Sequence, residues 1–170
     1  RLRRRIVPRA VTTWLPGVAP GTLDAALALR PDLGAAHGEF TAVFATLLTP
    51  AVHEACRIRV AQVLGRADLA AGEADPERVA AVARWWELGA VSADEAVVLS
   101  LAEQFVLDPH GVTAEQRAAV RDRFGEAGLV AVVEWLALLD GIVRFQTVLG
   151  LAADTEGSAG GADEGSDRDG

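Results

Sequence analysis

The stretch HEACRIRVAQVLGRADLAAGE, from His53 to Glu73, decides the fold prediction because it combines a helical core pattern with several ionisable groups. On a helix over residues 51–64, apolar side chains at spacings of three or four form one stripe: Val52, Ala55, Cys56, Val60 and Val63. Cys56 lies inside this stripe, and a buried free cysteine behaves as a small hydrophobic residue. We therefore predict that Cys56 is a packed core thiol.

Helix signals repeat along the rest of the chain, whereas strand signals are nearly absent. Capping residues, prolines and apolar periodicity predict helix starts near Thr22, Asp32, Thr49, Asp75, Ser92, Thr113 and Ala127. Glycines predict helix ends at Gly65, Gly89 and Gly150. The helix expected over residues 32–48 has its own apolar stripe of Phe40, Val43, Phe44 and Leu47. The sequence therefore predicts an all-α fold, a compact bundle of about seven helices.

Composition excludes several classes of protein. The chain has 170 residues, enough for one domain, and a formal net charge of −8 at pH 7, which argues against nucleic-acid binding. No apolar run approaches the roughly eighteen residues of a membrane span, and no secretory signal peptide is recognised. One cysteine and three histidines predict neither a CxxC redox pair nor a metal site, and we expect no cofactor. We expect a cytoplasmic protein.

Charge divides the chain into three parts. Five arginines among the first nine residues make residues 1–20 a basic N-terminal arm, either a solvated terminus or a contact for an acidic partner. The last seventeen residues contain six acidic side chains and nothing more hydrophobic than alanine, so residues 153–170 are predicted to be a disordered acidic tail. The helical domain is expected over residues 21–152.

Glu54 and Arg57 lie on a different face of the helix over residues 51–64 from Cys56. They are three residues apart and are expected to form an ion pair. At the surface such a pair contributes about 0–1 kcal/mol and has no further meaning. In a pocket or at an oligomer interface, the same carboxylate would act as a general base with a tuned pKa. The sequence leaves both interpretations open.

Other side chains have two interpretations each. His110, in LDPHGVT, is a turn residue or a proton shuttle. Asp140 and Arg144, four residues apart, are expected to pair, and Arg144 serves either the structure or a substrate carboxylate. Of the adjacent Trp85 and Trp86, one is expected to pack inside and the other to make a subunit contact, with ligand stacking as the alternative.

Three stretches, considered together, resemble a known family. They are ALRPDLGAAHGEFTAVFATLLTPAVHEACRIRVAQVLG (residues 28–65), AEQFVLDPHGVT (residues 102–113) and WLALLDGIVRFQTVLGL (residues 135–151). Their order and spacing resemble the alkylhydroperoxidase D-like / carboxymuconolactone decarboxylase superfamily, over roughly residues 24–152. The resemblance implies a helical bundle of the alkylhydroperoxidase D-like type that assembles into a homo-oligomer, a trimer or a hexamer.

The resemblance also implies which chemistry is missing. The peroxidase branch of this family has a glutamate, a CxxC pair and then a histidine, and Glu54 matches the glutamate. Arg66, Leu69 and Glu73 stand at the positions of the two cysteines and the histidine, so thiol peroxidase activity is not expected. The decarboxylase branch acts on small carboxylated lactones without a cofactor. For that activity the resemblance implies Glu54 as acid or base, helped by His110, and three arginines as substrate-binding residues: Arg57, Arg66 and Arg144.

Two functional hypotheses follow. The first is a cofactor-independent enzyme that acts on a small carboxylate or lactone. The second is a non-catalytic oligomeric protein of the same family that binds a ligand or a partner. The enzyme is favoured if Glu54, Arg66 and Glu73 converge on an enclosed pocket. The second hypothesis is favoured if the polar, glycine-rich segment GRADLAAGEADPE is a solvated turn.

Overall fold

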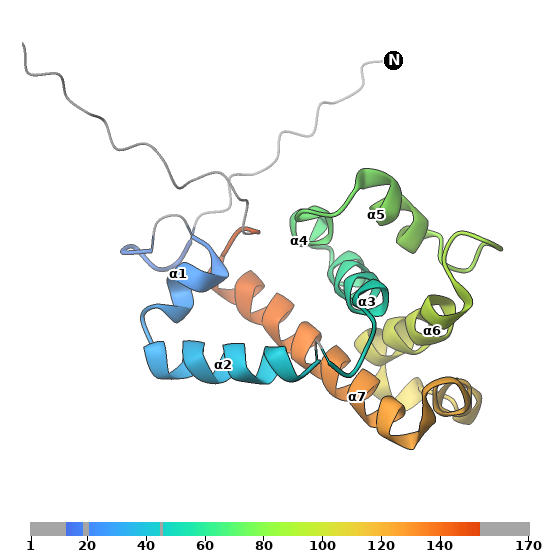
Figure 1. Cartoon of the computed structure of the whole chain (residues 1–170). Coiled ribbons are helices and arrows are strands. Elements are labelled where there is room, and N and C mark those ends of the chain that lie inside the picture. Colours follow the sequence, from blue (N-terminus) through green and yellow to red (C-terminus); the bar gives the residue numbers. More distant parts are fainter. Residues whose placement is uncertain (1–12, 19–20, 45, 154–170) are drawn as a thin grey trace, which may run out of the picture.

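The computed structural model describes residues 13–18, 21–44 and 46–153. These residues form seven α-helices, one 3₁₀ turn and no strand, which confirms the predicted all-α fold for this part of the chain. The elements are α1 (Leu23–Leu27), α2 (Pro31–Phe44), α3 (Pro50–Val63), α4 (Ala67–Ala71), α5 (Pro76–Ala83), α6 (Ala93–Leu107), the 3₁₀ turn η1 (Pro109–Gly111) and α7 (Ala114–Leu149) (Figure 1). Most of the predicted basic arm and nearly all of the predicted acidic tail lie outside the described residues.

The predicted helix starts are set by side-chain caps. The hydroxyl of Thr49 accepts a hydrogen bond from a backbone N–H in the first turn of α3. Ser92 and Glu95 form a reciprocal capping box at the start of α6, and Thr113 and Gln116 form another at the start of α7. These contacts satisfy backbone donors that have no partner within the helix, and they confirm the starts expected from the sequence.

Two helix ends differ from the prediction, and one short helix was not predicted. The helix α2 ends at Phe44, four residues before its expected end, and α5 ends at Ala83, well before Gly89. The segment expected to be a polar turn contains α4, whose Leu69 and Ala70 are buried in the core. A five-residue helix is too short to show apolar periodicity, so the sequence pattern could not predict it.

The last two predicted helices form the single element α7, which is bent at Gly125. This residue has φ 74° and ψ 177°, a backbone conformation that is essentially restricted to glycine. Residues after the bend run back across the molecule, and Figure 1 shows this part of α7 (orange) passing between α2 and the group formed by α3, α5 and α6. The bend therefore directs the second half of α7 along the core.

The centre of the bundle is α3, which packs against α4, α5, α6 and α7. Four members of the predicted stripe, Val52, Ala55, Cys56 and Val60, are at most 1% exposed, whereas the fifth, Val63, is partly buried against the core. Ile58 and Ala61, which lie outside this stripe, are also fully buried. A helix surrounded on several sides buries more than one stripe.

The pair α1 and α2 lies to one side of this bundle (Figure 1). Phe44, at the end of α2, is 3% exposed and lies with its ring centroid 5.2 Å from that of Trp135 on α7. The other members of the predicted apolar stripe, Phe40, Val43 and Leu47, are each about half exposed, and Leu47 lies beyond the end of α2, so only Phe44 joins the core. The reason is that α2 meets the bundle mainly at one end.

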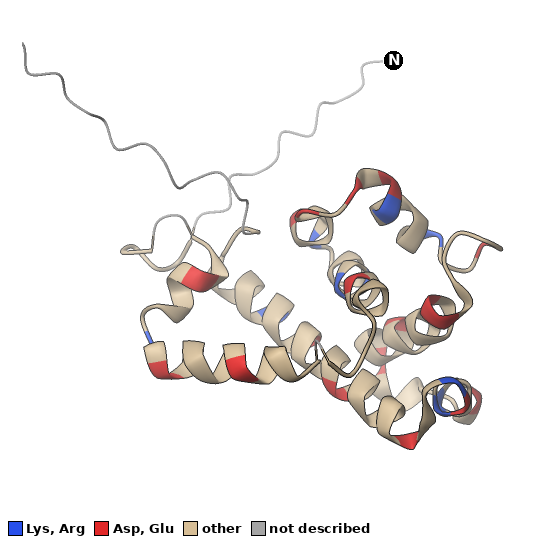
Figure 2. Ribbon diagram, viewed as in Figure 1, with Lys and Arg blue, Asp and Glu red and all other residues tan. Residues whose placement is uncertain are grey.

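The charged side chains of α2 are all acidic (Figure 2).

Candidate functional site

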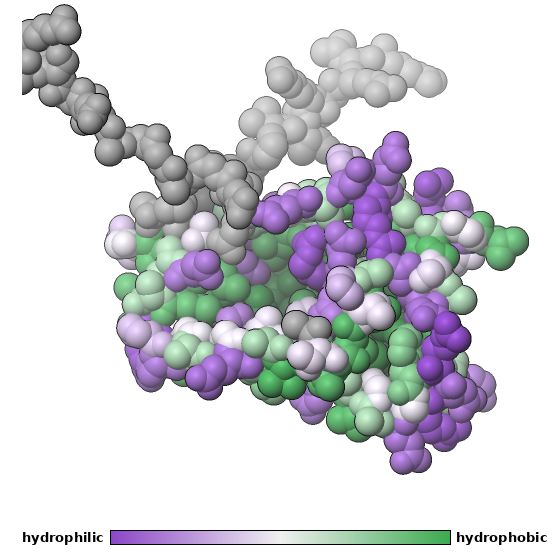
Figure 3. Space-filling view, viewed as in Figure 1, coloured by the Kyte–Doolittle hydropathy of each residue, from purple (hydrophilic) through white to green (hydrophobic). Residues whose placement is uncertain are grey.

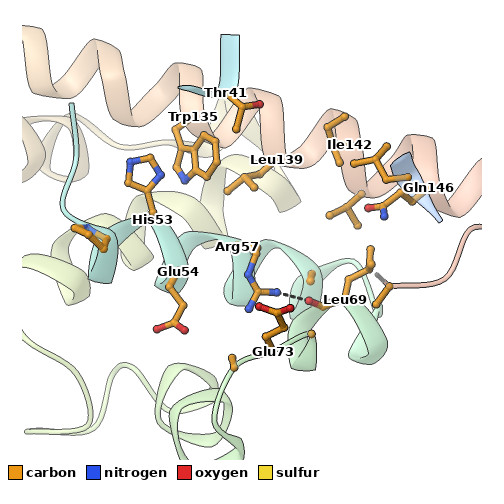
Figure 4. Close-up of a pocket in the computed structure, with 17 residues that line it drawn as sticks. Thr41, His53, Glu54, Arg57, Leu69, Glu73, Trp135, Leu139, Ile142 and Gln146 are labelled. Carbon is orange, nitrogen blue, oxygen red and sulfur yellow. Dashed lines mark hydrogen bonds between the residues drawn. The ribbon is translucent and has the colours of Figure 1, made fainter. Parts of the chain in front are cut away.

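A cavity of about 810 Å³ lies between α2, α3, α4 and α7. Figure 3 shows it as a hollow with a hydrophobic floor, open toward the viewer. Much of its wall is apolar and comes from α4 and α7: Leu69, Trp135, Leu139, Ile142 and Val143. Its polar side chains come from α2, α3, the segment after α4, and α7: Thr41, His53, Glu54, Arg57, Glu73 and Gln146 (Figure 4). An apolar cavity with a few converging polar groups is the usual form of a small-molecule site.

Arg57 is the cationic side chain of this cavity. Its Nη1 donates a hydrogen bond to the backbone oxygen of Leu69 (Figure 4). Within the described residues no carboxylate comes within ion-pair distance of its guanidinium group. Burial lowers the pKa of Arg57, and the negative charges of Glu54 and Glu73 act against that effect. The guanidinium group therefore has donors left over for a ligand.

Glu54 does not pair with Arg57, which corrects the expectation from their spacing. Its Oε2 lies 3.1 Å from Nε of Arg78 on α5. Arg78 also binds the buried carboxylate of Glu95 on α6, so it bridges two acidic residues. The difference arises from contacts between helices. The carboxylate of Glu54 contacts Arg78 on α5, whereas the guanidinium group of Arg57 contacts the backbone of α4.

Glu73 lies at the exposed mouth of the cavity, just after α4. Gly72, which precedes it, has φ 45°, and a side chain there would meet Nη1 of Arg57 at 3.2 Å. The absence of a side chain at Gly72 thus lets the guanidinium group lie against this turn. Glu73 has no hydrogen bond or ion pair with a described residue, and in Figure 4 its carboxylate is drawn next to the end of Arg57.

The opposite end of the cavity contains residues that the sequence analysis did not select. Nε2 of His53 lies 2.6 Å from the backbone oxygen of Phe44. Its ring lies edge-on to Trp135, with a centroid distance of 4.6 Å. Trp135 is 8% exposed, and neither its indole nitrogen nor the hydroxyl of Thr41 has a hydrogen-bond partner among the described residues. Only the bend and position of α7, which the sequence pattern did not show, bring these residues together.

Arg66 lies outside the cavity lining. It forms a two-point ion pair with Asp68 and donates hydrogen bonds to Oγ1 of Thr147 at 3.1 Å and to the backbone oxygen of Leu151 at 2.7 Å. Its side chain is 13% exposed. The hydrogen bonds of Arg66 thus tie the start of α4 to the end of α7. The structure brings Glu54 and Glu73 to the cavity with Arg57, but not Arg66.

Arg144 and His110 also lie away from the cavity. The predicted pair of Asp140 and Arg144 is confirmed at 2.8 Å, and its hydrogen bond raises the pKa of the largely exposed Arg144. His110 is exposed in the 3₁₀ turn, where its backbone N–H donates to the carboxylate of Asp108. In this structure both residues make contacts that stabilise local backbone and helix geometry.

Cys56 has no exposed surface, which confirms the predicted core thiol. Burial, followed by the negative charge of Glu95, raises its pKa to about 12. A thiol in this state has almost no thiolate, the form that reacts with peroxides and disulfides.

The tryptophan pair is arranged as predicted, with one ring inside and one outside. Trp85 packs against the core, and its indole N–H donates to Glu103 at 2.9 Å. Trp86 is 62% exposed, with the guanidinium group of Arg59 5.9 Å from its ring centre. Neither ring lines the cavity described above.

Comparison with known proteins adds no assignment: no family model matches the chain, and no curated protein has a similar sequence. In the described part of the chain, no three His, Cys, Asp or Glu side chains gather as metal ligands. Within the same residues, no helix has both the length and the apolar character needed to cross a bilayer.

Proposed function

We propose that the cavity binds a small, largely apolar molecule with a carboxylate or lactone group, and that Arg57 holds its anionic end. The observation that carries this proposal is a partly buried guanidinium group in an apolar cavity without a carboxylate partner among the described residues. We propose that the protein is carboxymuconolactone decarboxylase-like and of the alkylhydroperoxidase D-like type, without thiol peroxidase activity.

Physical chemistry supports an anionic ligand at Arg57. The guanidinium group has five N–H donors in a planar fork, which matches the two oxygens of a carboxylate. Of the two acids nearby, Glu54 is already neutralised by Arg78, and Glu73 lies at the solvated mouth. An anion that enters along the apolar wall of the cavity would therefore find the guanidinium group of Arg57 as the nearest charge.

A cofactor-independent enzyme is the more specific form of this proposal. Glu73 is a carboxylate on the cavity wall without a described partner, so it is free to accept or donate a proton. Glu54 also lines the cavity, but its carboxylate is already engaged by Arg78, which makes it the weaker candidate. Catalysis would consist of proton transfer to or from a ligand that Arg57 positions.

The alternative is a non-catalytic member that binds a ligand and assembles into a homo-oligomer. The observation that favours assembly is an exposed apolar surface on α2 and the turn after it, formed by Phe40, Val43 and Leu47. In the single chain, each of these three large apolar side chains is about half exposed. We refer to these three residues as the α2 apolar surface and propose that it contacts another copy of the chain in a trimer or hexamer.

Ligand binding is tested by thermal-shift and calorimetric titration of benzoate and other small carboxylates against the full chain. We expect binding to wild type and at least a tenfold loss of affinity in Arg57→Gln. Arg144→Gln is the matched control, because Arg144 is exposed and outside the cavity. Equal affinities in wild type and Arg57→Gln, or no binding at all, would overturn the proposal.

Proton transfer is tested separately with a carboxylate that binds and has hydrogens on a carbon next to a carbonyl group, because the aromatic hydrogens of benzoate are not acidic. Exchange of its carbon-bound hydrogens in heavy water, followed by NMR, reports a catalysed step without knowledge of the natural substrate. The enzyme hypothesis expects exchange in wild type and its loss in Glu73→Gln, with binding retained. Binding without exchange in wild type supports the non-catalytic alternative.

A further inference from the structure

We propose that Thr41, His53 and Trp135 form a second polar subsite, which takes a neutral oxygen of the ligand whose carboxylate lies at Arg57. The ligand is then a hydroxy- or oxo-carboxylate rather than a simple apolar acid. This inference rests on the proposed function of the cavity and names the chemical class of its ligand.

The first observation is the indole N–H of Trp135. Trp135 lines the cavity, is 8% exposed, and its Nε1 atom is buried without a hydrogen-bond acceptor. Buried indole nitrogens nearly always have a partner, because an unpaired donor away from water costs free energy. The edge-on contact with His53 places an imidazole ring beside this indole. An acceptor oxygen from a ligand would satisfy the donor.

The second observation is the hydroxyl of Thr41, which comes from a different helix. Its Oγ1 atom is also buried without a partner, although threonine in a helix commonly bonds to a carbonyl of the preceding turn. Thr41 precedes Phe44 by three residues, so both lie on the same side of α2, and Phe44 contacts Trp135. Thr41 and Trp135 both line one end of the same cavity, and each has one buried polar atom without a partner among the described residues (Figure 4).

The third observation fixes the hydrogen-bonding state of His53. Its Nε2 lies 2.6 Å from the backbone oxygen of Phe44, and a carbonyl oxygen can only accept. Nε2 must therefore carry a proton, so Nδ1 is the one ring nitrogen that can accept a hydrogen bond. The subsite thus combines two donors, the indole N–H and the threonine hydroxyl, with one acceptor. A ligand hydroxyl can both accept from the donors and donate to Nδ1, and a carbonyl can use the donors alone.

The spacing on α3 guides the choice of a probe. His53 and Arg57 are one helical turn apart, a backbone rise of about 6 Å. The wall between them is apolar and comes from α7. Both unpaired atoms are covered in this structure, so a side chain at the wall must change its rotamer before the ligand oxygen reaches them.

The test uses para-hydroxybenzoate, whose carboxylate and hydroxyl are held roughly one helical turn apart across a rigid apolar ring. Para-toluate replaces the hydroxyl with a methyl group of similar size, and meta-hydroxybenzoate moves the hydroxyl off the axis. We expect calorimetry on the full chain to give about tenfold tighter binding of para-hydroxybenzoate than of either control compound. In Trp135→Phe and in Thr41→Val this preference should fall to about threefold or less, with the affinity for para-toluate unchanged.

Trp86→Phe is the matched control, because Trp86 is exposed and outside the cavity, and it should keep the full preference. If all three compounds bind equally well and depend on Arg57, the second subsite is wrong and the proposed function stands. If the preference exists but survives in Trp135→Phe and Thr41→Val, the hydroxyl binds elsewhere and this inference is also overturned. If no compound binds, both proposals fail. A loss of folding in Trp135→Phe is detected by circular dichroism, and Thr41→Val then decides the test.

Discussion

The carboxylate of Glu54 lies 3.1 Å from Nε of Arg78, on a helix that follows it by more than twenty residues. Arg78 holds Glu95 at the same time, and the side chain of Glu95 is only 6% exposed. This bridge connects α3, α5 and α6 through charged groups, from the partly exposed Glu54 to the buried Glu95. It also explains why Arg57, expected to be the partner of Glu54, keeps its donors for the cavity.

Arg78→Gln is therefore expected to destabilise the fold strongly. The substitution leaves the carboxylate of Glu95 buried without its cation, which costs about 3 kcal/mol of unfolding free energy. Arg84→Gln is the matched control: Arg84 and its partner Glu87 are both more than half exposed, so the expected change is within about 0.5 kcal/mol. Urea denaturation followed by circular dichroism measures both values. Similar losses in the two variants would contradict the bridge.

Acid should destabilise the protein through two carboxylates that accept hydrogen bonds in the folded state, those of Glu95 and Glu103. Burial alone would raise the pKa values of Glu95 and Glu103, but hydrogen bonds from Arg78 and Ser92 to the first and from Trp85 and Arg59 to the second lower both below 4.5. The unfolded chain then binds protons more tightly, so the contribution of these two carboxylates to the free energy of unfolding is fully present above pH 4.5 and is lost as the pH falls below it.

The measurement is urea denaturation in buffers from about pH 3 to about pH 6.5. Arg78→Gln should reduce the slope below pH 4.5, since it removes one cause of the lowered pKa of Glu95. Stability that is independent of pH, or that rises on acidification, would show that these carboxylates are not selectively stabilised in the folded state.

The elements of the fold that depend on local sequence were predictable. Thr49, Ser92 and Thr113 cap their helices as expected, because a cap needs only the residue and the three or four positions after it. The core stripe of α3 with Cys56 was likewise visible from periodicity alone. Each of these predictions uses interactions within one helix.

The candidate site was only half predictable, because it depends on contacts between distant segments. Arg57 and Glu54 were selected by residue type, but the partner of Glu54 comes from α5, and periodicity carries no information on that pairing. His53 and Trp135 were not selected as site residues, since their contact depends on the path of α7 after Gly125. Residue charge and helix caps can be predicted from a few neighbouring residues. A cavity wall made from four helices depends on how distant segments pack, so it cannot be predicted in this way.

The buried state of Cys56 predicts an unreactive thiol. With its pKa raised to about 12 by burial, the native protein should not react with a thiol-specific disulfide reagent near neutral pH. The thiol should become reactive in urea, along the same transition that circular dichroism reports. Rapid labelling of the native protein, or catalytic consumption of hydrogen peroxide, would contradict both the burial and the exclusion of peroxidase chemistry.

Two glycines of α7 should respond in opposite directions to the same substitution. Gly125→Ala forces a side chain onto a backbone with φ 74°, so the fold should lose about 1–2 kcal/mol. Gly141 lies inside the helix with nothing within 4 Å of a new Cβ atom, so Gly141→Ala should add about 0.5–1 kcal/mol. Thermal melting of both variants separates the two effects, and a shift of the same sign in both would show that Gly125 does not set the bend.

The α2 apolar surface should control assembly. Phe40, Val43 and Leu47 are each about half exposed in one chain, and an apolar surface that meets a second copy is buried there. We expect wild type to be a trimer or hexamer by light scattering, and Val43→Glu to dissociate it, because a carboxylate in an apolar interface loses its water without gaining a partner. Val130→Glu is the control, since Val130 is similarly exposed but lies on α7 in the turns just after the bend. The helical content of both variants should stay the same. A monomeric wild type, or an oligomer that only Val130→Glu disrupts, would mean that α2 does not form the contact.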